Sequence, residues 1–472
     1  MTGVFDLAAL KRRLAEAPDG AGLRPIGLQD VHVGAGALES LPDVVASLVP
    51  SGEHHGPVAV LSDLTPKRYC SGELLEYATK AIASAAGVRG VLVGTAGHNV
   101  HADEATIARA TDDTEGASCI VAVGSGTVAD VGKVLAASHH VPYVIVQTAD
   151  SVNGFADDRS VLLINGVKRT VPSTWANVLV ADTDVLVDAP VEMNASGLAD
   201  LIAMFTAPAD WYLANLLGMD DSYSPTVVAL AREQGSALLQ AARRIPGADS
   251  VALGQIAATL TLSGISMGIA GTTAPCSGME HAVSHLLEMA AVKAGDEAAL
   301  HGLQVGASSV VAALVWQRVL DEISDGGLER LSEPDPVASE MAVRAAFLAV
   351  DPSGEMAAEC WHEHEAKLVR WSRSAERIAL AAAQWPLHEE ALRHLLVSPA
   401  EIVDALGGAG APVSFADLTP SVPGEAARWA VANCNLMRER FSVADLASFL
   451  GIWNEELVDS LLQEASTLGA AQ

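Results

Sequence analysis

Short apolar runs recur through the first 190 residues, with segments of helical spacing between them. The runs lie at residues 57–63, 91–94, 119–124 and 141–147, and a further strand region spans 176–187. Apolar runs without polar alternation indicate strands that are buried on both faces of a parallel sheet. The pattern predicts an α/β domain with helices on both faces of its sheet, and a helix ahead of it in the first 30 residues.

One stretch of this region follows a different pattern. Two β-rich arms meet at Asn165-Gly166, a dipeptide that suits a tight turn because both of its positions need positive φ. We therefore expect a β-hairpin near residues 160–173.

The pattern of apolar and polar residues changes after Pro190. Long Ala- and Leu-rich segments at helical spacing continue to the end of the chain, interrupted by glycine and proline. The sequence predicts two domains: an α/β domain over residues 1–190 and an all-helical domain over 191–472.

The charge balance narrows the class of partner. The 472 residues carry 28 Lys and Arg against 58 Asp and Glu, a net charge of −30. This argues against nucleic acid or an anionic membrane as a partner. An anionic substrate would need basic residues that are concentrated locally. The five cysteines are scattered, which fits a reducing cytoplasm, and we expect no signal peptide and no membrane span.

A glycine-rich turn follows the run at 119–124. Gly124-Ser125-Gly126-Thr127 leads into a helix that carries Asp130. Glycines at a strand-to-helix turn let the backbone approach a pyrophosphate, whose charge the helix N-terminus favours. Such turns also arise from chain geometry alone, so this motif is weak by itself.

Three polar residues follow other strands of the predicted sheet. Asp63 could accept hydrogen bonds from a ribose diol, or could simply cap a helix. Thr148 and Ser151 follow the run at 141–147, at the strand edge where open α/β sheets bind ligands, although turn residues often look the same.

The second half carries a cluster of metal-binding residue types. His281 and His285 are four residues apart and share a helix face, His301 follows on a second helix, and Asp200 lies on a third. One carboxylate and two or three imidazoles suit a catalytic divalent metal, which needs three protein ligands and one open position. Glu288 could orient an imidazole from behind. Each histidine alone is more often an ordinary core or surface residue than a ligand.

Taken together, these motifs resemble the superfamily of 3-dehydroquinate synthase, glycerol dehydrogenase and iron-containing alcohol dehydrogenases. Within it, the chain is similar to bacterial sn-glycerol-1-phosphate dehydrogenases of the AraM type. The likeness covers roughly residues 30–450 and includes 151–155, 166–170, 181–190, 195–200, 277–285 and 438–446. It implies a dehydroquinate synthase-like fold: an α/β nucleotide-binding domain followed by an all-α metal-binding domain.

The resemblance also implies roles for individual residues. It makes Asp200, His281 and His301 the metal ligands and His285 the imidazole near the reacting oxygen. It places the pyrophosphate along the glycine turn and Asp130, and the adenosine and ribose around Asp63, Thr148 and Ser151. Iron-dependent relatives carry a histidine where this chain has Met204, so three ligands remain, which favours zinc, or nickel.

Two departures from the family pattern affect the expected chemistry. Asn153 stands where these enzymes usually carry an aspartate beside the nicotinamide and the substrate hydroxyls. An amide still forms hydrogen bonds but cannot accept a proton. Asp157 and Asp158, followed by Arg159, stand where the family tends to have small residues.

The resemblance implies a metal-dependent oxidoreductase that uses NAD or NADP to interconvert a small phosphorylated ketone and a secondary alcohol. Dihydroxyacetone phosphate and sn-glycerol 1-phosphate, which belong to phospholipid metabolism, are the expected pair. Lys168 and Arg169 on the hairpin, with Arg159, are candidates for the substrate phosphate, although an exposed basic hairpin explains the first two equally well. Asp63 favours NAD, because a carboxylate repels a 2′-phosphate. We expect a cytoplasmic homodimer or larger oligomer.

Two alternatives remain open from the sequence. One is a sugar-phosphate cyclase or lyase like dehydroquinate synthase, which uses NAD transiently but typically needs a denser set of basic residues than this chain offers. The other is a catalytically impaired nucleotide-binding homologue, for which Asn153 is the reason and the intact Asp200, His281 and His301 set the counterargument.

Overall fold

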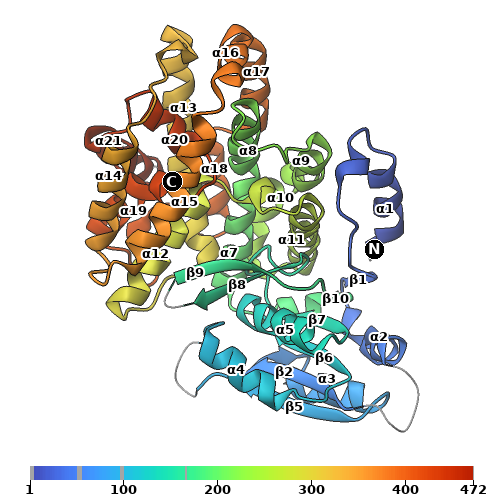
Figure 1. Cartoon of the computed structure of the whole chain (residues 1–472). Coiled ribbons are helices and arrows are strands. Elements are labelled where there is room, and N and C mark those ends of the chain that lie inside the picture. The colour runs from blue at the N-terminus through green and yellow to red at the C-terminus, as the bar shows by residue number, and fades with distance from the viewer. Residues whose placement is uncertain (1–4, 50–55, 96–99, 165–166, 471–472) are drawn as a thin grey trace. The chain divides into compact units, whose positions relative to one another are not determined.

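The structure is a computed structural model that describes residues 5–49, 56–95, 100–164 and 167–470 (Figure 1). The chain divides into two compact units. The α/β unit contains Met1–Leu201 and Ala229–Gly271, and the helical unit contains Ile202–Val228 and Thr272–Gln472. The predicted boundary after residue 190 stays a prediction.

A six-stranded parallel sheet forms the centre of the α/β unit in the part of the chain that the structure describes. Its strand order is β1-β10-β7-β6-β2-β5. The bounds are Asp30–Val33 (β1), Val58–Asp63 (β2), Val88–Val93 (β5), Cys119–Gly124 (β6), Tyr143–Gln147 (β7) and Val178–Ala181 (β10). The predicted α/β class with a parallel sheet is confirmed, and the apolar runs at 57–63, 119–124 and 141–147 correspond to strands.

Two details of the prediction were wrong. The strand region expected over 176–187 is a strand only to Ala181, because Asp182 caps the short helix α6 (Thr183–Leu186) by accepting a hydrogen bond from the Asp184 N–H. The edge strand β1 was missed because only one of its four residues, Val31, is buried, so it lacks an apolar run.

Helices cover both faces of the sheet, as the buried strands require. One face packs against α2 (Leu41–Leu48) and α3 (Leu74–Ala83), in a core built from alternate strand residues such as Val58 and Val60. The other face carries α5 (Gly126–His139), which contacts β6 and β7. Gly132 of α5 lies so close that a Cβ there would stand 2.7 Å from the Tyr143 ring.

The strand order reverses beside β2. From β2 the chain steps outward to β5 and then returns to the opposite side of β2 to form β6. The carboxyl ends of β2 and β6 therefore flank the point at which open α/β sheets bind ligands. Ser62 ties the two ends together, because its hydroxyl donates to the Val123 carbonyl over 2.8 Å.

The predicted hairpin is present as an antiparallel pair, β8 (Arg159–Ile164) and β9 (Val167–Pro172). Its turn residues, Asn165 and Gly166, lie outside the described residues. The unit also holds the predicted first helix α1 (Leu7–Ala15), the small strands β3 (Arg68–Tyr69) and β4 (Gly72–Glu73), α4 (Glu104–Asp113), α7 (Val191–Leu201), α10 (Gly235–Ala241) and α11 (Ser250–Ala270).

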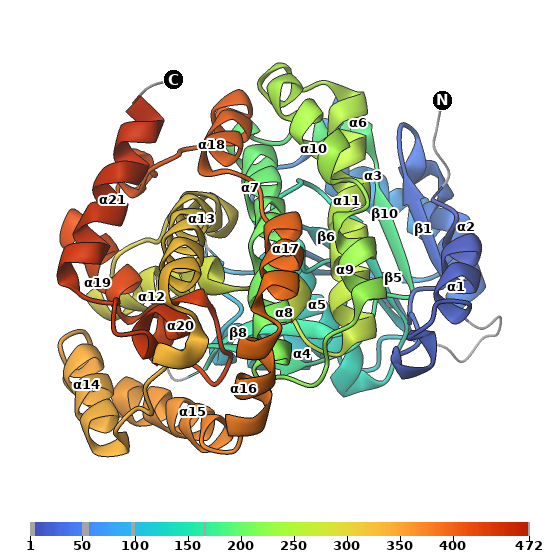
Figure 2. The ribbon, with the colours of Figure 1, turned by 90° about the horizontal axis from the view of Figure 1, so that it is seen from above.

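The helical unit is organised around α13 (His301–Gly326). This helix packs against α12 (Met279–Ala294), α18 (Pro399–Gly408), α20 (Val443–Phe449) and α21 (Glu455–Ala470), as Figure 2 shows. Further helices are α8 (Ala207–Leu216), α14 (Pro336–Leu348), α15 (Glu355–Trp371), α16 (Ala375–Ala383), α17 (Trp385–Leu395) and α19 (Gly424–Asn433), while α9 (Pro225–Arg232) crosses between the units along the chain. The prediction that this part of the chain is helical is confirmed for the described residues of the helical unit.

Two helices are long and apolar enough to cross a bilayer by length and composition alone. They are α11 and residues His301–Ser324 of α13. Most of each is buried inside the protein, which is typical of core helices.

Candidate functional site

The glycine turn lies at the carboxyl end of β6. Gly124 ends the strand and Gly126 begins α5. A Cβ on Gly124 would stand 2.4 Å from the Cβ of Val128, and one on Gly126 would stand 2.8 Å from Val152 Cγ2. Both positions therefore require glycine. The turn brings the backbone and the helix N-terminus to the reversal point of the sheet, as pyrophosphate binding needs.

Asp63 ends β2 on the other side of this reversal point. Its Oδ1 accepts a hydrogen bond from the Thr65 N–H (2.7 Å) and forms an ion pair with Lys67 Nζ (2.6 Å). No helix begins among the described residues 64–67, so the carboxylate shapes a turn and does not cap a helix. Lys67, which sequence reasoning passed over, brings a positive charge to the expected ribose position.

The segment after β7 is held in place by α7. The Thr148 N–H donates to the Gly124 carbonyl (3.1 Å), and the Ser196 hydroxyl donates to the Ser151 carbonyl (3.1 Å). A Cβ on Gly197 would stand 2.2 Å from the Asp150 oxygen, so helix and segment touch through their backbones. Thr148 and Ser151 thus lie at the strand edge where they were expected.

Asn153 and Asp200 are joined directly within the α/β unit. The Asn153 N–H donates to Asp200 Oδ2 over 2.8 Å, and both residues are buried. Asp200 lies near the end of α7, just before Leu201, the last residue of this stretch of the unit. The residue that departs from the family pattern therefore helps to fix the carboxylate that is expected to bind metal.

A buried lysine anchors the chain beyond Asn153. Lys133 of α5 is completely buried and forms an ion pair with Asp157. Its ammonium also donates to the carbonyls of Gly154 (2.5 Å) and Arg159 (2.8 Å). Sequence reasoning missed Lys133 and treated Asp157 only as a departure from the family. The structure pairs the two.

The remaining acidic residues of this region also have structural partners. Asp158 approaches Arg24 (3.5 Å) and Arg159 (3.6 Å), and Arg159 donates to the Gly271 carbonyl (2.8 Å). Burial raises the pKa of Asp130 to about 7, against the opposing effects of Lys133 and a hydrogen bond from the Val161 backbone. Asp130 and Arg159 therefore brace the hairpin, and their expected ligand contacts stay predictions.

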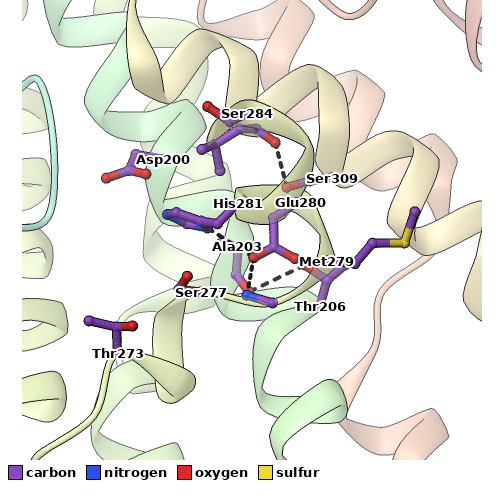
Figure 3. Close-up of polar contacts among 12 residues, drawn as sticks. Asp200, Ala203, Thr206, Thr273, Ser277, Met279, Glu280, His281, Ser284 and Ser309 are labelled. Carbon is purple, nitrogen blue, oxygen red and sulfur yellow. Dashed lines mark hydrogen bonds and ion pairs between the residues drawn. The ribbon is translucent and has the colours of Figure 1, made fainter. Parts of the chain in front are cut away.

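In the helical unit, Glu280 orients His281. The Nδ1 atom of His281 lies 2.9 Å from Glu280 Oε1, and both side chains are buried (Figure 3). The Thr206 hydroxyl donates to Glu280 Oε2 (3.0 Å) and the Gly278 N–H donates to Oε1 (2.5 Å). Burial acts to raise the pKa of Glu280, but the hydrogen bonds and the charge of His281 outweigh it and lower the pKa.

Glu288 has the same relation to His301. The Nδ1 atom of His301 lies 3.3 Å from Glu288 Oε1 and 3.2 Å from the Ser284 hydroxyl. A carboxylate on one ring nitrogen fixes the tautomer and turns the other nitrogen toward a ligand, a common arrangement behind metal-binding histidines. His281 and His301 therefore each have a glutamate beside one ring nitrogen, as metal-binding histidines commonly do.

The three imidazoles lie together. The ring centroids of His281 and His301 are 5.4 Å apart, and His285 lies 6.2 Å from the first and 5.5 Å from the second. Donor atoms of His285, Glu288 and His301 all lie within 4.8 Å of one another. Nitrogen and carboxylate oxygen suit a borderline divalent metal, so the donor chemistry of the helical unit fits one.

Long-range contacts hold the segment that leads into α12. Asp210 of α8 accepts from the N–H groups of Met279 (2.8 Å) and Val443 (3.0 Å), and burial raises its pKa well above the usual range. Arg438 donates to the Gly278 carbonyl (2.6 Å), and Arg440 to the Ser277 carbonyl (2.6 Å). The helix that carries His281 is thus fixed from distant parts of the sequence.

Some of these residues left a signal in the sequence. Glu280 directly precedes His281, and Arg438 and Arg440, with one residue between them, stand out in a chain with a net charge of −30. Lys133 left none, because a lysine at helical spacing looks like a solvent-facing residue until its burial is known.

The sequence is similar to a known protein family and to several of its members. Residues 32–190 match the family model described as iron-containing alcohol dehydrogenase. An NAD(P)+-linked glycerol-1-phosphate dehydrogenase of Bacillus licheniformis is 28% identical over 343 residues, which cover 71% of this chain and 83% of that protein. The enzyme of the same name from Methanosphaera stadtmanae is 30% identical over 298 residues, which cover 62% of this chain and 80% of that protein.

Solved structures share the fold. A probable glycerol dehydrogenase from Sinorhizobium meliloti matches with a TM-score of 0.58 at 16% identity, over 95% of this chain and 100% of that one. A maleylacetate reductase from Rhizobium sp. strain MTP-10005 matches with a TM-score of 0.57 at 17% identity, over 94% and 98% of the two chains. At these identities the likeness concerns the fold. It confirms the predicted pairing of an α/β domain with a helical domain.

Proposed function

Because the chain belongs to the glycerol-1-phosphate dehydrogenase family, within the superfamily of iron-containing alcohol dehydrogenases, we propose that it is a metal-dependent, NAD(P)-linked oxidoreductase. Its reaction is the reversible reduction of a small phosphorylated ketone to a secondary alcohol. Dihydroxyacetone phosphate and sn-glycerol 1-phosphate are the first pair to test, because the relatives carry that name. We expect a cytoplasmic homodimer or larger assembly.

The observation that carries this proposal is the pair of imidazoles with glutamates behind them. Asp200, His281 and His301 are the proposed metal ligands, with zinc or nickel as the ion. Glu280 and Glu288 support the role of the two histidines, since each holds one ring nitrogen. When bound, the metal polarises the substrate oxygen and NAD(P)H supplies the hydride.

The cofactor is assigned to the carboxyl edge of the sheet. The backbone of Gly124, Ser125, Gly126 and Thr127, with Asp130, is proposed for the pyrophosphate. Asp63, Thr148 and Ser151 are proposed for the adenosine and ribose. The strand reversal between β2 and β6 and the requirement for glycine at the turn support this assignment.

The chain's own residues handle the proton and orient the substrate. His285 is partly exposed and lies beside His301, so it can accept or give a proton directly or through water. Asn153 can form a hydrogen bond to a substrate hydroxyl but cannot take its proton. The proposed roles follow the predicted domains: residues 1–190 hold the cofactor and supply Asn153, and residues 191–472 hold the metal and most of the substrate.

The test is steady-state oxidation of NADH and NADPH by the full chain with dihydroxyacetone phosphate. Protein stripped of metal should be inactive and should recover with zinc or nickel, while His281→Ala should lose at least about a thousandfold in kcat with any metal. Chiral assay of the product should give sn-glycerol 1-phosphate. Full turnover by the metal-stripped protein would overturn the proposal.

Two further outcomes would redirect the assignment. Release of inorganic phosphate without net NAD(P)H consumption would identify a cyclase or lyase. Activity that appears only in Asn153→Asp would identify an impaired homologue, whereas turnover by the natural chain shows that the amide suffices.

A further inference from the structure

Arg438 and Arg440 form an arginine pair beside the segment that leads into α12. Arg438 donates to the Gly278 carbonyl (2.6 Å) and contacts the Ser277 hydroxyl (3.5 Å). Arg440 donates to the Ser277 carbonyl (2.6 Å) and the Thr273 hydroxyl (2.7 Å). Both arginines keep part of their surface accessible, so a ligand can reach them.

The charge of this pair is unusual in its surroundings. Among the described residues, neither guanidinium has a carboxylate oxygen within the 4.0 Å of an ion pair, although the chain carries 58 acidic residues. Their bonded partners are neutral carbonyls and hydroxyls. Burial, and then the charge of Arg438, lower the pKa of Arg440 to about 9, against the opposing charges of Asp220, Glu280 and Asp210. Glu280 and Asp210 act on both arginines from beyond contact distance in the direction that raises their pKa values, but they form no ion pair with either guanidinium. The N–H donors that the two side chains do not use in these bonds can therefore serve a bound anion.

Donors remain for such an anion. A guanidinium has five N–H donors, and each arginine uses two of its nitrogens in bonds within the described part of the chain. Arginine forks match the oxygens of a phosphate, often in pairs of parallel bonds. The first N–H groups of α12 are not available, because Glu280 and Asp210 already accept from Gly278 and Met279. Any anion here must therefore be held by side chains.

The position suits the phosphate of a three-carbon substrate. Gly278, which Arg438 contacts, lies three residues before His281, or about 4.5 Å of helical rise. In dihydroxyacetone phosphate, one carbon and one ester oxygen separate the ketone carbon from the phosphorus. A phosphate near the start of α12 would leave the ketone close to the imidazole cluster.

We propose that Arg438 and Arg440, with the hydroxyls of Thr273 and Ser277, bind the phosphate group of the substrate. This assignment rests on the proposed function and differs from the hairpin candidates Lys168, Arg169 and Arg159. It gives the arginine pair a role in specificity: selection of the phosphorylated ketone over its unphosphorylated counterpart.

The first experiment compares kcat/KM for dihydroxyacetone phosphate with kcat/KM for dihydroxyacetone in the metal-loaded enzyme. In Arg440→Met this ratio should fall about 10- to 100-fold, the effect of one lost charged hydrogen-bonding group, mainly through KM. Arg440→Lys should fall less, because it keeps the charge. The matched control Arg393→Met, which removes an exposed arginine of α17, should leave the ratio unaltered.

Two results would overturn the assignment. Equal loss on both ketones in Arg440→Met would make the pair a purely structural clamp. A larger fall of the ratio in Lys168→Met would place the phosphate on the hairpin. If Arg440→Met does not fold, Arg440→Lys and Arg438→Met carry the same comparison.

A second readout does not depend on turnover. Inorganic phosphate should raise the melting temperature of the natural protein, and the rise should be lost in Arg440→Met and kept in Arg393→Met. If no phosphorylated ketone is reduced but this difference holds, the anion site stands and the proposed function fails. If the ketone is reduced but phosphate protects both variants equally, the proposed function stands and the arginine assignment fails.

Discussion

The two units place their functional residues in different ways. In the α/β unit, the candidate cofactor residues follow directly after buried strands, and backbone geometry puts them at one edge of the sheet. In the helical unit, side chains from distant segments fix the start of α12, the helix that carries His281 and His285. Asp210 and Arg438, for example, both hold the first turn of α12.

This difference has an energetic side. A site at the ends of strands needs little stabilisation beyond that of the sheet itself, because the backbone of the turns positions most of its groups. A site held by buried charges depends on each partner, since removing one leaves the other unpaired in a poorly solvated place. The comparison therefore predicts that replacing one partner of a buried charge near the imidazoles has a large effect, which can be traced to the contact that was lost. It also has one exception, which the first prediction addresses.

Lys133 is that exception, because it is a buried charge that holds a loop of the α/β unit. Lys133→Met should destabilise the protein by about 3–5 kcal/mol, since Asp157 would lose the buried cation that it pairs with and two carbonyls would lose a donor. Chemical denaturation measures the loss. The double variant Lys133→Met with Asp157→Leu should recover most of it, because no charge is left unpaired.

A loss below about 1 kcal/mol in Lys133→Met would mean that the loop does not depend on this pair. The α/β unit would then rely on backbone geometry alone, and the contrast between the units would be complete.

The second prediction sharpens the comparison in the helical unit. Glu280→Gln should weaken metal affinity about 10- to 100-fold, because the amide holds the His281 ring less firmly and does not raise its basicity. Glu288→Gln should act similarly through His301. Competition with a chromophoric chelator measures both, and Glu464→Gln on α21, which removes an exposed partner of Arg318, is the matched control.

The two glutamates can also be told apart. If Glu288 is itself a ligand, in the set with His285 and His301, its substitution should abolish binding where Glu280→Gln only weakens it. Unchanged affinity in both variants would contradict the orienting role.

The two units also differ in how much of their structure the sequence predicts. The strands, the hairpin and the glycine turn were predictable because each leaves a local signal, such as an apolar run or a dipeptide that tolerates positive φ. The edge strand β1 was missed, since an exposed strand has no apolar run. The imidazole cluster could be proposed from a four-residue spacing on one helix.

What the sequence could not reveal is pairing at a distance. Lys133 with Asp157, and Arg440 with the Ser277 carbonyl, join residues that are far apart along the chain. No periodicity marks such pairs, because either partner alone looks like a solvated surface residue. The pairing becomes visible only when burial is known.

The third prediction concerns a histidine outside the site. Burial, followed by the nearby charge of Lys367, lowers the pKa of His364 to about 3. The unfolded chain takes up a proton near pH 6.5 while the folded chain resists it, so this group removes stability as the pH falls below 6.5. At pH 5 the loss is about 2 kcal/mol.

His364→Gln should remove that loss. The variant should therefore lose less stability than the natural protein between pH 7 and pH 5, as measured by denaturation at each pH. If the stabilities of the variant and of the natural protein fall in parallel with pH, His364 is not held neutral in the folded state. Burying a charge in the helical unit would then cost less stability than the comparison of the two units supposes.

The smallest effect is expected at the cofactor edge of the α/β unit. Asp63 alone would repel the 2′-phosphate of NADP, but Lys67 lies 2.6 Å from its carboxylate and offsets that charge. Lys67→Gln should lower the ratio of kcat/KM for NADPH over NADH about fivefold, the scale of a partly exposed ion pair. Lys80→Gln is a matched control, because Lys80 forms the same four-residue pair with Glu76 on the exposed side of α3. A ratio that falls equally in both variants would reflect general charge. A fall confined to Lys67 would show that a neighbour four residues along the chain sets cofactor preference, with none of the distant partners that the helical unit requires.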